Sequence, residues 1–117
     1  MNKRQVGGVY EETAKAFLEK EGYKIVAANY RTKFGEIDLI GYDGGTLCFI
    51  EVKYRRSTAY GYPAEAVTAR KAATIRRVAQ AYLQMEGFYR PGGNLPMCRF
   101  DVVSVLGEEI TLIRNAF

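Results

Sequence analysis

The sequence predicts an α/β fold, a mixed β-sheet flanked by helices with the element order α-β-β-β-α-β-β. Three observations support this prediction. An apolar stripe at helical spacing lies near the N-terminus, two alternating segments flank a Gly-Gly pair, and a long helical segment separates these from two further strand-like segments. A helix that connects two strands in this way makes them parallel neighbours. The 117 residues are expected to form one domain, spanning residues 1–117.

The first half of the chain is expected to hold one helix and three strands. A helix is predicted over residues 9–21, because Gly22 is a helix-ending residue and one apolar stripe precedes it. The stripe consists of Tyr10, Ala14, Phe17 and Leu18. A strand is predicted over residues 23–31, and a hairpin follows with strands at 35–42 and 46–54.

The second half is expected to hold a long helix and a second hairpin. Pro63 suits the first turn of a helix and Gly87 suits the residue after its end, so the helix is predicted over residues 63–86. Its stripe consists of Val67, Lys71, Ile75, Val78 and Tyr82. The remaining elements are a loop over residues 87–97 and two strands, 98–106 and 109–114, on either side of Gly107.

The first hairpin carries the most informative residues of the chain. Gly44-Gly45 suits a two-residue primed turn, whose central positions need positive φ. This turn fixes the register of the two strands. The register pairs their ionic residues, Asp38 with Glu51 and Glu36 with Lys53. Because side chains alternate between the faces of a strand, these four side chains are expected to project from one face.

Directly opposed carboxylates repel each other unless a cation lies between them. The pairing of Asp38 with Glu51 therefore indicates a divalent-metal site. The alternative is a solvated sheet face, since charged residues often alternate with apolar ones on exposed hairpins. Two features favour the metal site. The same face is apolar near the turn and ionic at its far end, and opposed like charges destabilise a bare surface.

The composition limits both the partner and the metal. The net charge is +4 and the pI is about 9.1, which favours a polyanionic partner. The chain contains no histidine, which excludes Ser-His-Asp triads, histidine general bases and histidine-ligated zinc. A metal must then be held mainly by oxygen ligands, which suits Mg²⁺ or Mn²⁺.

Nothing in the sequence indicates export or a membrane. No apolar run follows the basic N-terminal segment, and no stretch approaches the length of a membrane span. Cys48 and Cys98 lack metal-ligand spacing and are expected to be free thiols in a reducing compartment. We therefore expect a cytoplasmic protein without membrane contact.

The segment 54–62 follows the proposed site and is rich in arginine and tyrosine, which indicates contact with nucleic acid. Arg55 and Arg56 would bind phosphates, and tyrosines such as Tyr60 would stack on unpaired bases. The alternative is a solvated loop whose tyrosines pack locally.

The second helix is expected to extend this basic surface. Arg70 and Arg77 lie off its apolar stripe and are expected to contact nucleic acid beside the site. Lys71 lies on the stripe, so it either points at a phosphate or lies along its apolar neighbours with its ammonium in water.

Together these motifs resemble those of the PD-(D/E)xK, restriction-endonuclease-like nucleases, with Asp on one central strand and Glu-x-Lys on the next. Several stretches are similar to those of the YraN family of small bacterial proteins, which is related in fold to archaeal Holliday-junction resolvases. They are Gly-Glu-Ile-Asp-Leu-Ile (35–40), Ile-Glu-Val-Lys-Tyr-Arg (50–55), Arg-Phe-Asp-Val-Val (99–103) and the terminal Asn-Ala-Phe (115–117). The resemblance covers the chain from about Gly8 to Phe117.

The resemblance implies a restriction-endonuclease-like fold and a metal-dependent nuclease. By position, Asp38 and Glu51 match the two acidic metal ligands, and the backbone carbonyl of Val52 is a further candidate ligand. Lys53 matches the catalytic lysine. Glu11 matches a glutamate that approaches the site from the first helix.

Other residues have two interpretations each. Glu36 either supports the metal ligands or pairs with Lys53, and Lys53 itself could form a salt bridge to Glu36 or to Glu51. Asp101 is expected to bind an arginine rather than a metal. Tyr10 stands where relatives are expected to have a glycine, and it could crowd the site.

Three functions are compatible with the sequence. The first is a metal-dependent endonuclease that hydrolyses phosphodiesters in DNA, on branched or flapped structures. The second is a non-catalytic nucleic-acid-binding module with the same fold, because 117 residues leave little room for a substrate clamp. The third is an interaction domain with structural carboxylates. Junction-cutting relatives are dimers, and the apolar segments 88–89 and 116–117 are consistent with a homodimer.

Overall fold

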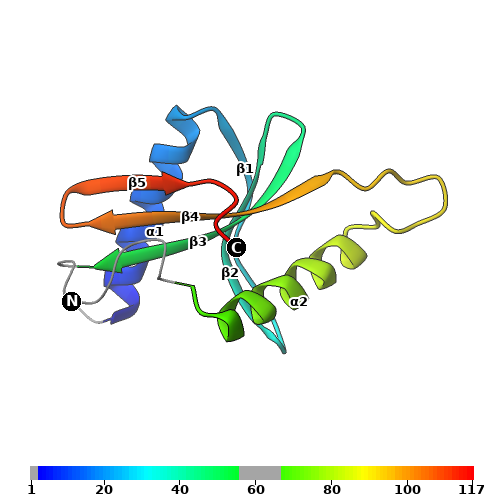
Figure 1. Ribbon diagram of the computed structural model, residues 1–117, viewed down its shortest axis with the longest axis horizontal. Coiled ribbons are helices and arrows are strands. Elements are labelled where there is room, and N and C mark those ends of the chain that lie inside the picture. Colours follow the sequence, from blue (N-terminus) through cyan, green and yellow to red (C-terminus); the bar gives the residue numbers. More distant parts are fainter. Residues whose placement is uncertain (1–2, 56–66) are drawn as a thin grey trace.

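The structure, a computed structural model, describes the backbone of residues 3–55 and 67–117 and the side chains of residues 8–55 and 67–117. Its elements follow the predicted order α-β-β-β-α-β-β (Figure 1). They are α1 (Lys3–Lys20), β1 (Tyr23–Thr32), β2 (Gly35–Asp43), β3 (Thr46–Arg55), α2 (Ala69–Met85), β4 (Met97–Leu106) and β5 (Glu109–Ile113).

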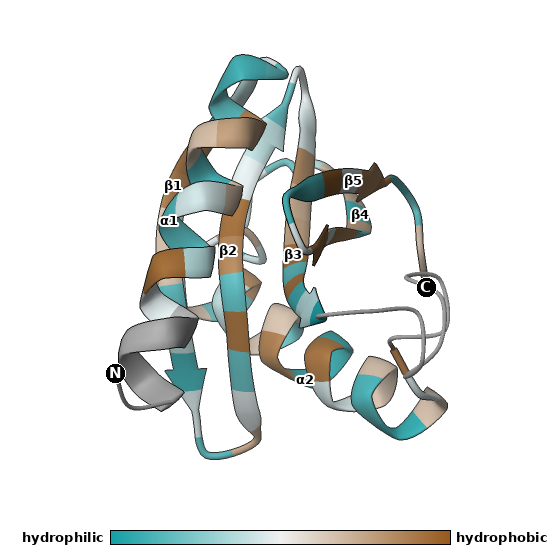
Figure 2. Ribbon diagram, turned by 90° about the vertical axis from the view of Figure 1, so that its left-hand side faces the viewer, coloured by the Kyte–Doolittle hydropathy of each residue, from teal (hydrophilic) through white to brown (hydrophobic). Residues whose placement is uncertain are grey.

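The five strands form one mixed sheet in the order β1-β2-β3-β4-β5. Strands β3 and β4 are parallel and every other pair is antiparallel, as the helix between β3 and β4 predicts. Leu39 and Ile40 are neighbours on β2 and point to opposite faces. Leu39 packs in the cluster that contains α1, and Ile40 packs in the cluster that contains α2. The helices therefore cover opposite faces of the sheet, as Figure 2 shows on either side of β2.

Helix α1 is longer than the sequence predicts, because it begins at Lys3 instead of residue 9. The apolar stripe that predicts this helix starts only at Tyr10, and the first helical turns include Gly7-Gly8, a pair of low helix propensity. The predicted end is confirmed, since Gly22 follows the helix with a φ of 96°. Ala14 and Leu18 are fully buried against the sheet, which confirms the apolar stripe.

The register of the first hairpin is confirmed from Leu39 paired with Ile50 to Asp43 paired with Thr46. The turn differs in one detail. Of the two glycines only Gly44 has positive φ, at 61°, which is the pattern of a type II′ turn rather than one needing positive φ at both positions. The register is the same for both turn types, so the strand pairing does not depend on this difference.

Helix α2 begins at Ala69, so the predicted start at residue 63 is wrong. The Thr68 hydroxyl accepts a hydrogen bond from the backbone N–H of Lys71 at 3.1 Å, and the extended backbone of Thr68 (ψ 163°) marks it as the N-cap. Pro63 lies outside the described residues. The face of α2 toward the sheet consists of Ala72, Ile75, Val78, Ala79, Tyr82 and Leu83, and it does not include Lys71.

At the end of the sheet near the first hairpin turn, Asp101 is fully buried. Its carboxylate accepts hydrogen bonds from Arg99 at 2.8 Å, from the Tyr23 hydroxyl at 2.8 Å and from the backbone N–H of Asn115 at 2.9 Å. The expectation that Asp101 binds an arginine is confirmed. This network holds β4, β1 and the C-terminal segment together and is structural.

Cys48 is buried and Cys98 is exposed, and both are free thiols as expected. Neither described helix is long and apolar enough to cross a membrane.

Candidate functional site

Strands β2 and β3 separate at Asp38. Their ladder ends at the pair Leu39 and Ile50. Beyond it the backbone N–H of Val52 donates a hydrogen bond to Asp38 Oδ2 at 2.8 Å. The Asp38 carboxylate therefore takes the place of a strand carbonyl and lies in the fork between the two strands. The predicted strand pairing of Asp38 with Glu51 is not made, because the ladder stops one position before it.

An irregularity in β1 and β2 accompanies this fork. Ile37 and Ile40 are three residues apart, yet both pack in the cluster that contains α2, so the alternation of faces shifts between them. On β1, Asn29 lies between the residues that pair with Leu39 and Ile37, so it is opposite Asp38. Asn29 has a φ of 53°. Asparagine tolerates this left-handed conformation better than most residues. The shift breaks the regular strand geometry at the position of Asp38.

Three carboxylates meet at this point. One oxygen from each of Glu11 on α1, Glu36 and Asp38 lies within 4.8 Å of the others. Burial and the neighbouring carboxylates raise the pKa of Glu11. A hydrogen bond from the Asn29 amide lowers this pKa, but by less. Burial, followed by the charge of Glu51, raises the pKa of Asp38 to about 7, although the N–H of Val52 opposes the shift. A proton or a cation would relieve this repulsion.

Glu51 has a different environment. Its side chain is 5% exposed, and Oε1 lies 3.4 Å from the Nζ of Lys53 and 3.3 Å from the Nζ of Lys71. Lys53 thus pairs with Glu51, whereas Glu36 pairs with Arg31 of β1 at 3.3 Å. Of the two partners considered for Lys53, the structure shows Glu51 and not Glu36, whose carboxylate pairs with β1 instead.

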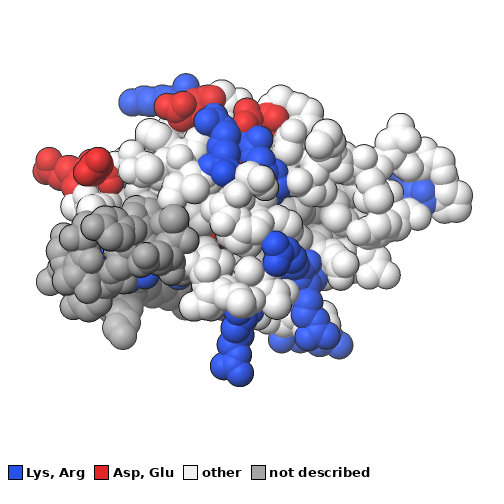
Figure 3. Space-filling model, in the orientation of Figure 1, with Lys and Arg blue, Asp and Glu red and all other residues white. Residues whose placement is uncertain are grey.

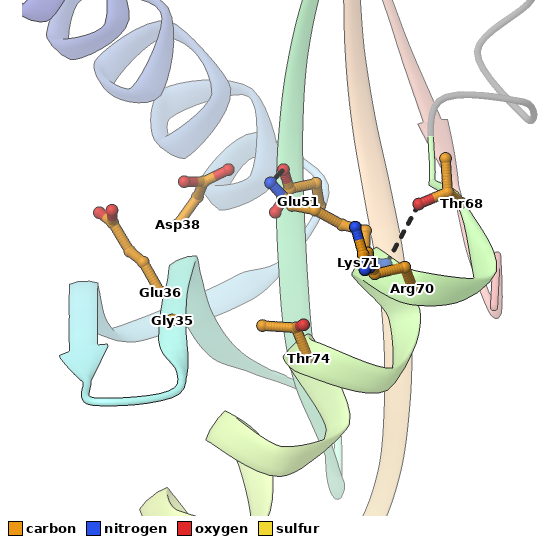
Figure 4. Close-up of a pocket in the computed structure, with 8 residues that line it drawn as sticks. All are labelled: Gly35, Glu36, Asp38, Glu51, Thr68, Arg70, Lys71 and Thr74. Carbon is orange, nitrogen blue, oxygen red and sulfur yellow. Dashed lines mark hydrogen bonds and ion pairs between the residues drawn. The ribbon is translucent and has the colours of Figure 1, made fainter.

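Asp38, Glu51 and Lys71 help to line a pocket of about 340 Å³ between the sheet and the N-terminal half of α2 (Figure 4). One wall carries the carboxylates of the sheet, and the other carries hydroxyl and basic side chains of α2. The lining residues are Gly35, Glu36, Asp38, Glu51, Thr68, Arg70, Lys71 and Thr74. Figure 4 shows the side chain of Lys71 reaching from α2 to Glu51. The acidic wall is suited to a cation and the opposite wall to an anion.

The predicted nucleic-acid residues fall in three places. Arg70 and Lys71 line the pocket. The guanidinium of Arg77 lies 4.6 Å from the centre of the Phe34 ring, next to the pocket. Arg55 is the half-buried last residue of β3 rather than part of a loop. Arg56 and Tyr60 lie outside the described residues, so their roles stay predictions.

Tyr10 and Tyr54 stack on each other with ring centres 3.8 Å apart. Tyr54 therefore packs locally, which was the alternative to stacking on a base. The same contact holds the ring of Tyr10 beside the end of strand β3.

Three contributors to the site were missed in the sequence. Asn29 bonds to Glu11, and Thr68 and Thr74 line the helix wall. Thr68 before a helical pattern is a capping signal, which the proline at residue 63 obscured. Asn29, which directly follows the apolar run 25–28, was a signal of irregular backbone. Nothing in the sequence pattern distinguished Thr74.

Comparison with known proteins agrees with the motifs. The model of the uncharacterised protein family UPF0102 matches residues 10–105. A UPF0102 protein of Symbiobacterium thermophilum is 51% identical over 119 residues, covering 97% of both chains. One of Caldicellulosiruptor saccharolyticus is 45% identical over 123 residues, covering 100% of both chains. The YraN family is UPF0102, so the resemblance to that family is confirmed. The matched region includes the three clustered carboxylates, Glu11, Glu36 and Asp38. The chain belongs to the UPF0102 family.

Proposed function

We propose that this protein is a divalent-metal-dependent phosphodiester hydrolase that acts on nucleic acid, with DNA as the expected substrate. The observation that carries the proposal is the pocket whose sheet wall is acidic and whose helix wall carries basic and hydroxyl groups. A phosphodiester is itself an anion and is repelled by carboxylates. A divalent cation between the two would remove that repulsion.

The carboxylates have the chemistry of a hard-cation site. Glu11, Glu36 and Asp38 present oxygens within 4.8 Å of one another. Mg²⁺ needs only one or two carboxylates and completes its shell with water and phosphate oxygens. Mg²⁺ or Mn²⁺ held here would polarise the substrate phosphate and make an attacking water more acidic. Glu51 is the further ligand that the family resemblance implies, and the backbone carbonyl of Val52 is an additional candidate.

Lys53, which contacts Glu51, and the residues on the helix wall of the pocket have roles that follow from charge and position. Lys53 lies beside Glu51 and can position a water molecule or offset negative charge that develops on the phosphate. Arg70, Thr68 and Thr74 line the wall of the pocket opposite the carboxylates, and their guanidinium and hydroxyl groups can hold the non-reacting phosphate oxygens.

A non-catalytic nucleic-acid-binding module is the second candidate, and one observation favours it. Glu51 is already compensated by Lys53 and Lys71, so its charge requires no metal. In this candidate the pocket binds a phosphate without hydrolysing it.

An interaction domain with structural carboxylates is the third candidate, and it would bind no metal. The homodimer and the cytoplasmic location stay predictions.

Cleavage of a substrate panel separates these candidates. Linear, single-stranded, gapped, flapped and four-way DNA are incubated with Mn²⁺ and then with EDTA, using wild type and Asp38→Asn purified in parallel. The nuclease should cut at least one substrate in Mn²⁺, and both EDTA and Asp38→Asn should abolish the cut. Binding without cleavage of any substrate would favour the binding module. Cleavage that persists equally in Asp38→Asn would point to a contaminant and contradict the proposal.

A further inference from the structure

One stripe of α2 leads out of the pocket. Arg70, Thr74 and Arg77 are four and three residues apart, so they lie along one side of the helix. Contacts show that this side faces the β1–β2 turn. A Cβ on Gly35 would lie 2.7 Å from Thr74 Cγ2, and Arg77 lies over the ring of Phe34. We call Arg70, Thr74, Arg77 and Phe34 the α2 track.

The track is strongly basic. Helix α2 contains four basic residues and no acidic residue, and all four are exposed. They are Arg70, Lys71, Arg76 and Arg77. Figure 3 shows basic side chains standing out on the side of the molecule where α2 lies, with no acidic side chain standing out beside them. This charge is complementary to a polyanion that continues beyond the pocket.

The far end of the track combines an exposed aromatic ring with two cationic groups. The Phe34 side chain is 41% exposed although it is apolar. The Arg77 guanidinium lies 4.6 Å and the Lys33 ammonium 5.3 Å from its ring centre. Aromatic rings and guanidinium planes are the surfaces on which unpaired bases stack. A base inside a duplex cannot use such a surface, because both of its faces are already stacked.

We propose that the α2 track holds the unpaired strand that leaves the pocket. Arg70 and Arg77 contact its backbone, and its base stacks on the Phe34–Arg77 pair. At 1.5 Å of rise per residue, Arg70 and Arg77 are separated by about 10 Å along the helix, which spans about three phosphates of a stacked strand. The substrate class is therefore nucleic acid with a single-stranded segment. This inference rests on the proposed function, which places the reacting phosphate in the pocket.

Equilibrium binding, measured in EDTA and again with Ca²⁺ in place of Mg²⁺ or Mn²⁺ so that the pocket carboxylates are neutralised, tests the path separately from cleavage. Fluorescence anisotropy is measured with a single-stranded oligonucleotide and with a blunt duplex of the same length, over a range of salt concentrations. Arg77→Gln should weaken single-strand binding severalfold and reduce the salt slope by about 0.7. Arg70→Gln should behave in the same way. Arg90→Gln is the matched control, because it removes one exposed arginine beyond the end of α2 and should change little.

Phe34 tests the stacking separately from the charge. Phe34→Ala should weaken single-strand binding at least about fivefold without changing the salt slope, and should leave duplex binding within about twofold. Phe34→Leu keeps apolar bulk under Arg77 and should give the same result if the alanine variant folds poorly. The proposal is overturned if wild type binds no single strand, if Arg90→Gln is as damaging as Arg77→Gln, or if both Phe34 variants bind both ligands like wild type.

The two proposals fail in different ways. If wild type cuts no substrate but the track variants lose single-strand binding, the nuclease is wrong and the strand path stands. If Asp38→Asn abolishes cleavage while Arg77→Gln and Phe34→Ala bind like wild type, the nuclease stands and the strand path is wrong.

Discussion

The Nζ of Lys71 on α2 lies 3.3 Å from Oε1 of Glu51 on β3, so one buried carboxylate joins the helix wall of the pocket to its sheet wall. Lys53 lies 3.4 Å from the same oxygen. Two ammonium groups thus surround one carboxylate beside the proposed metal centre. A divalent cation that uses Glu51 must compete with them, and Lys71 is the more exposed of the two lysines.

Removing Lys71 should therefore strengthen metal binding. Lys71→Met keeps the length of the side chain and removes its charge, so the affinity for Mn²⁺ should rise by about 3- to 10-fold, as expected when a like charge a few ångströms away is lost. Titration calorimetry of the variant against wild type measures this change. Arg70→Met is the control, because Arg70 lines the same pocket and forms no described ion pair with Glu51. An unchanged or weaker affinity in Lys71→Met would show that the lysine does not compete.

The metal-free protein should lose stability as the pH rises. The pKa of Asp38 is raised from 3.8 to about 7 in the folded state, so folding favours the protonated carboxyl. Its contribution is complete below about pH 4 and is lost as the pH rises to about 7. Asp38→Asn should thus raise the free energy of unfolding at pH 8 by about 2–4 kcal/mol and change it little at pH 4.

Urea unfolding in EDTA at the two pH values measures this difference. The asparagine is nearly isosteric and can still accept the hydrogen bond of Val52 through its oxygen. Equal effects of the substitution at pH 4 and pH 8 would mean that Asp38 ionises normally in the fold.

Gly35 should be intolerant of any side chain. Its φ is 150°, and a Cβ there would lie 2.7 Å from Thr74 Cγ2. Gly35→Ala should lower the free energy of unfolding by about 1–3 kcal/mol, because it combines backbone strain with overpacking. Gly45→Ala is the matched control, since it has open space and no positive φ, and should change stability by less than about 1 kcal/mol. Equal unfolding midpoints for the two variants would contradict this close approach.

Lys53 should affect the rate of cleavage rather than binding. One contact among many phosphate contacts carries little affinity, whereas a charge that acts mainly in the transition state changes the rate. Lys53→Ala should bind DNA within about threefold of wild type and lose at least about 100-fold in single-turnover cleavage. Lys24→Ala removes an exposed lysine of β1 and serves as the control. A Lys53→Ala enzyme that cuts at the wild-type rate would reduce Lys53 to a salt-bridge partner of Glu51.

The sequence predicts which strands carry the site residues better than it predicts the local backbone and hydrogen bonds around those residues. Gly44-Gly45 sets the register of β2 and β3, and this placed Asp38 and Glu51 near each other. The register could not predict the fork, because the backbone N–H of Val52 bonds to the Asp38 side chain instead of continuing the ladder. The left-handed backbone of Asn29 on the neighbouring strand β1 was equally outside the reach of the register.

Contacts between residues far apart in the sequence could not be predicted either. The sequence gives no register between α2 and β3, so the pairing of Lys71 with Glu51 and the contact of Thr74 with Gly35 depend on how the helix docks. The start of α2 was misplaced for a local reason. A proline and a capping threonine are both start signals, and Thr68 is the one that caps α2.

Calorimetric titration of Mn²⁺ into wild type, Asp38→Asn and Glu36→Gln tests most directly whether the carboxylate cluster is a metal centre. The account predicts binding to wild type, with an affinity at least about 10-fold lower in each variant, because each removes one charged ligand of a site with few carboxylates. Equal heats in all three proteins, or no heat in any of them, would contradict the metal centre and the hydrolase proposed from it.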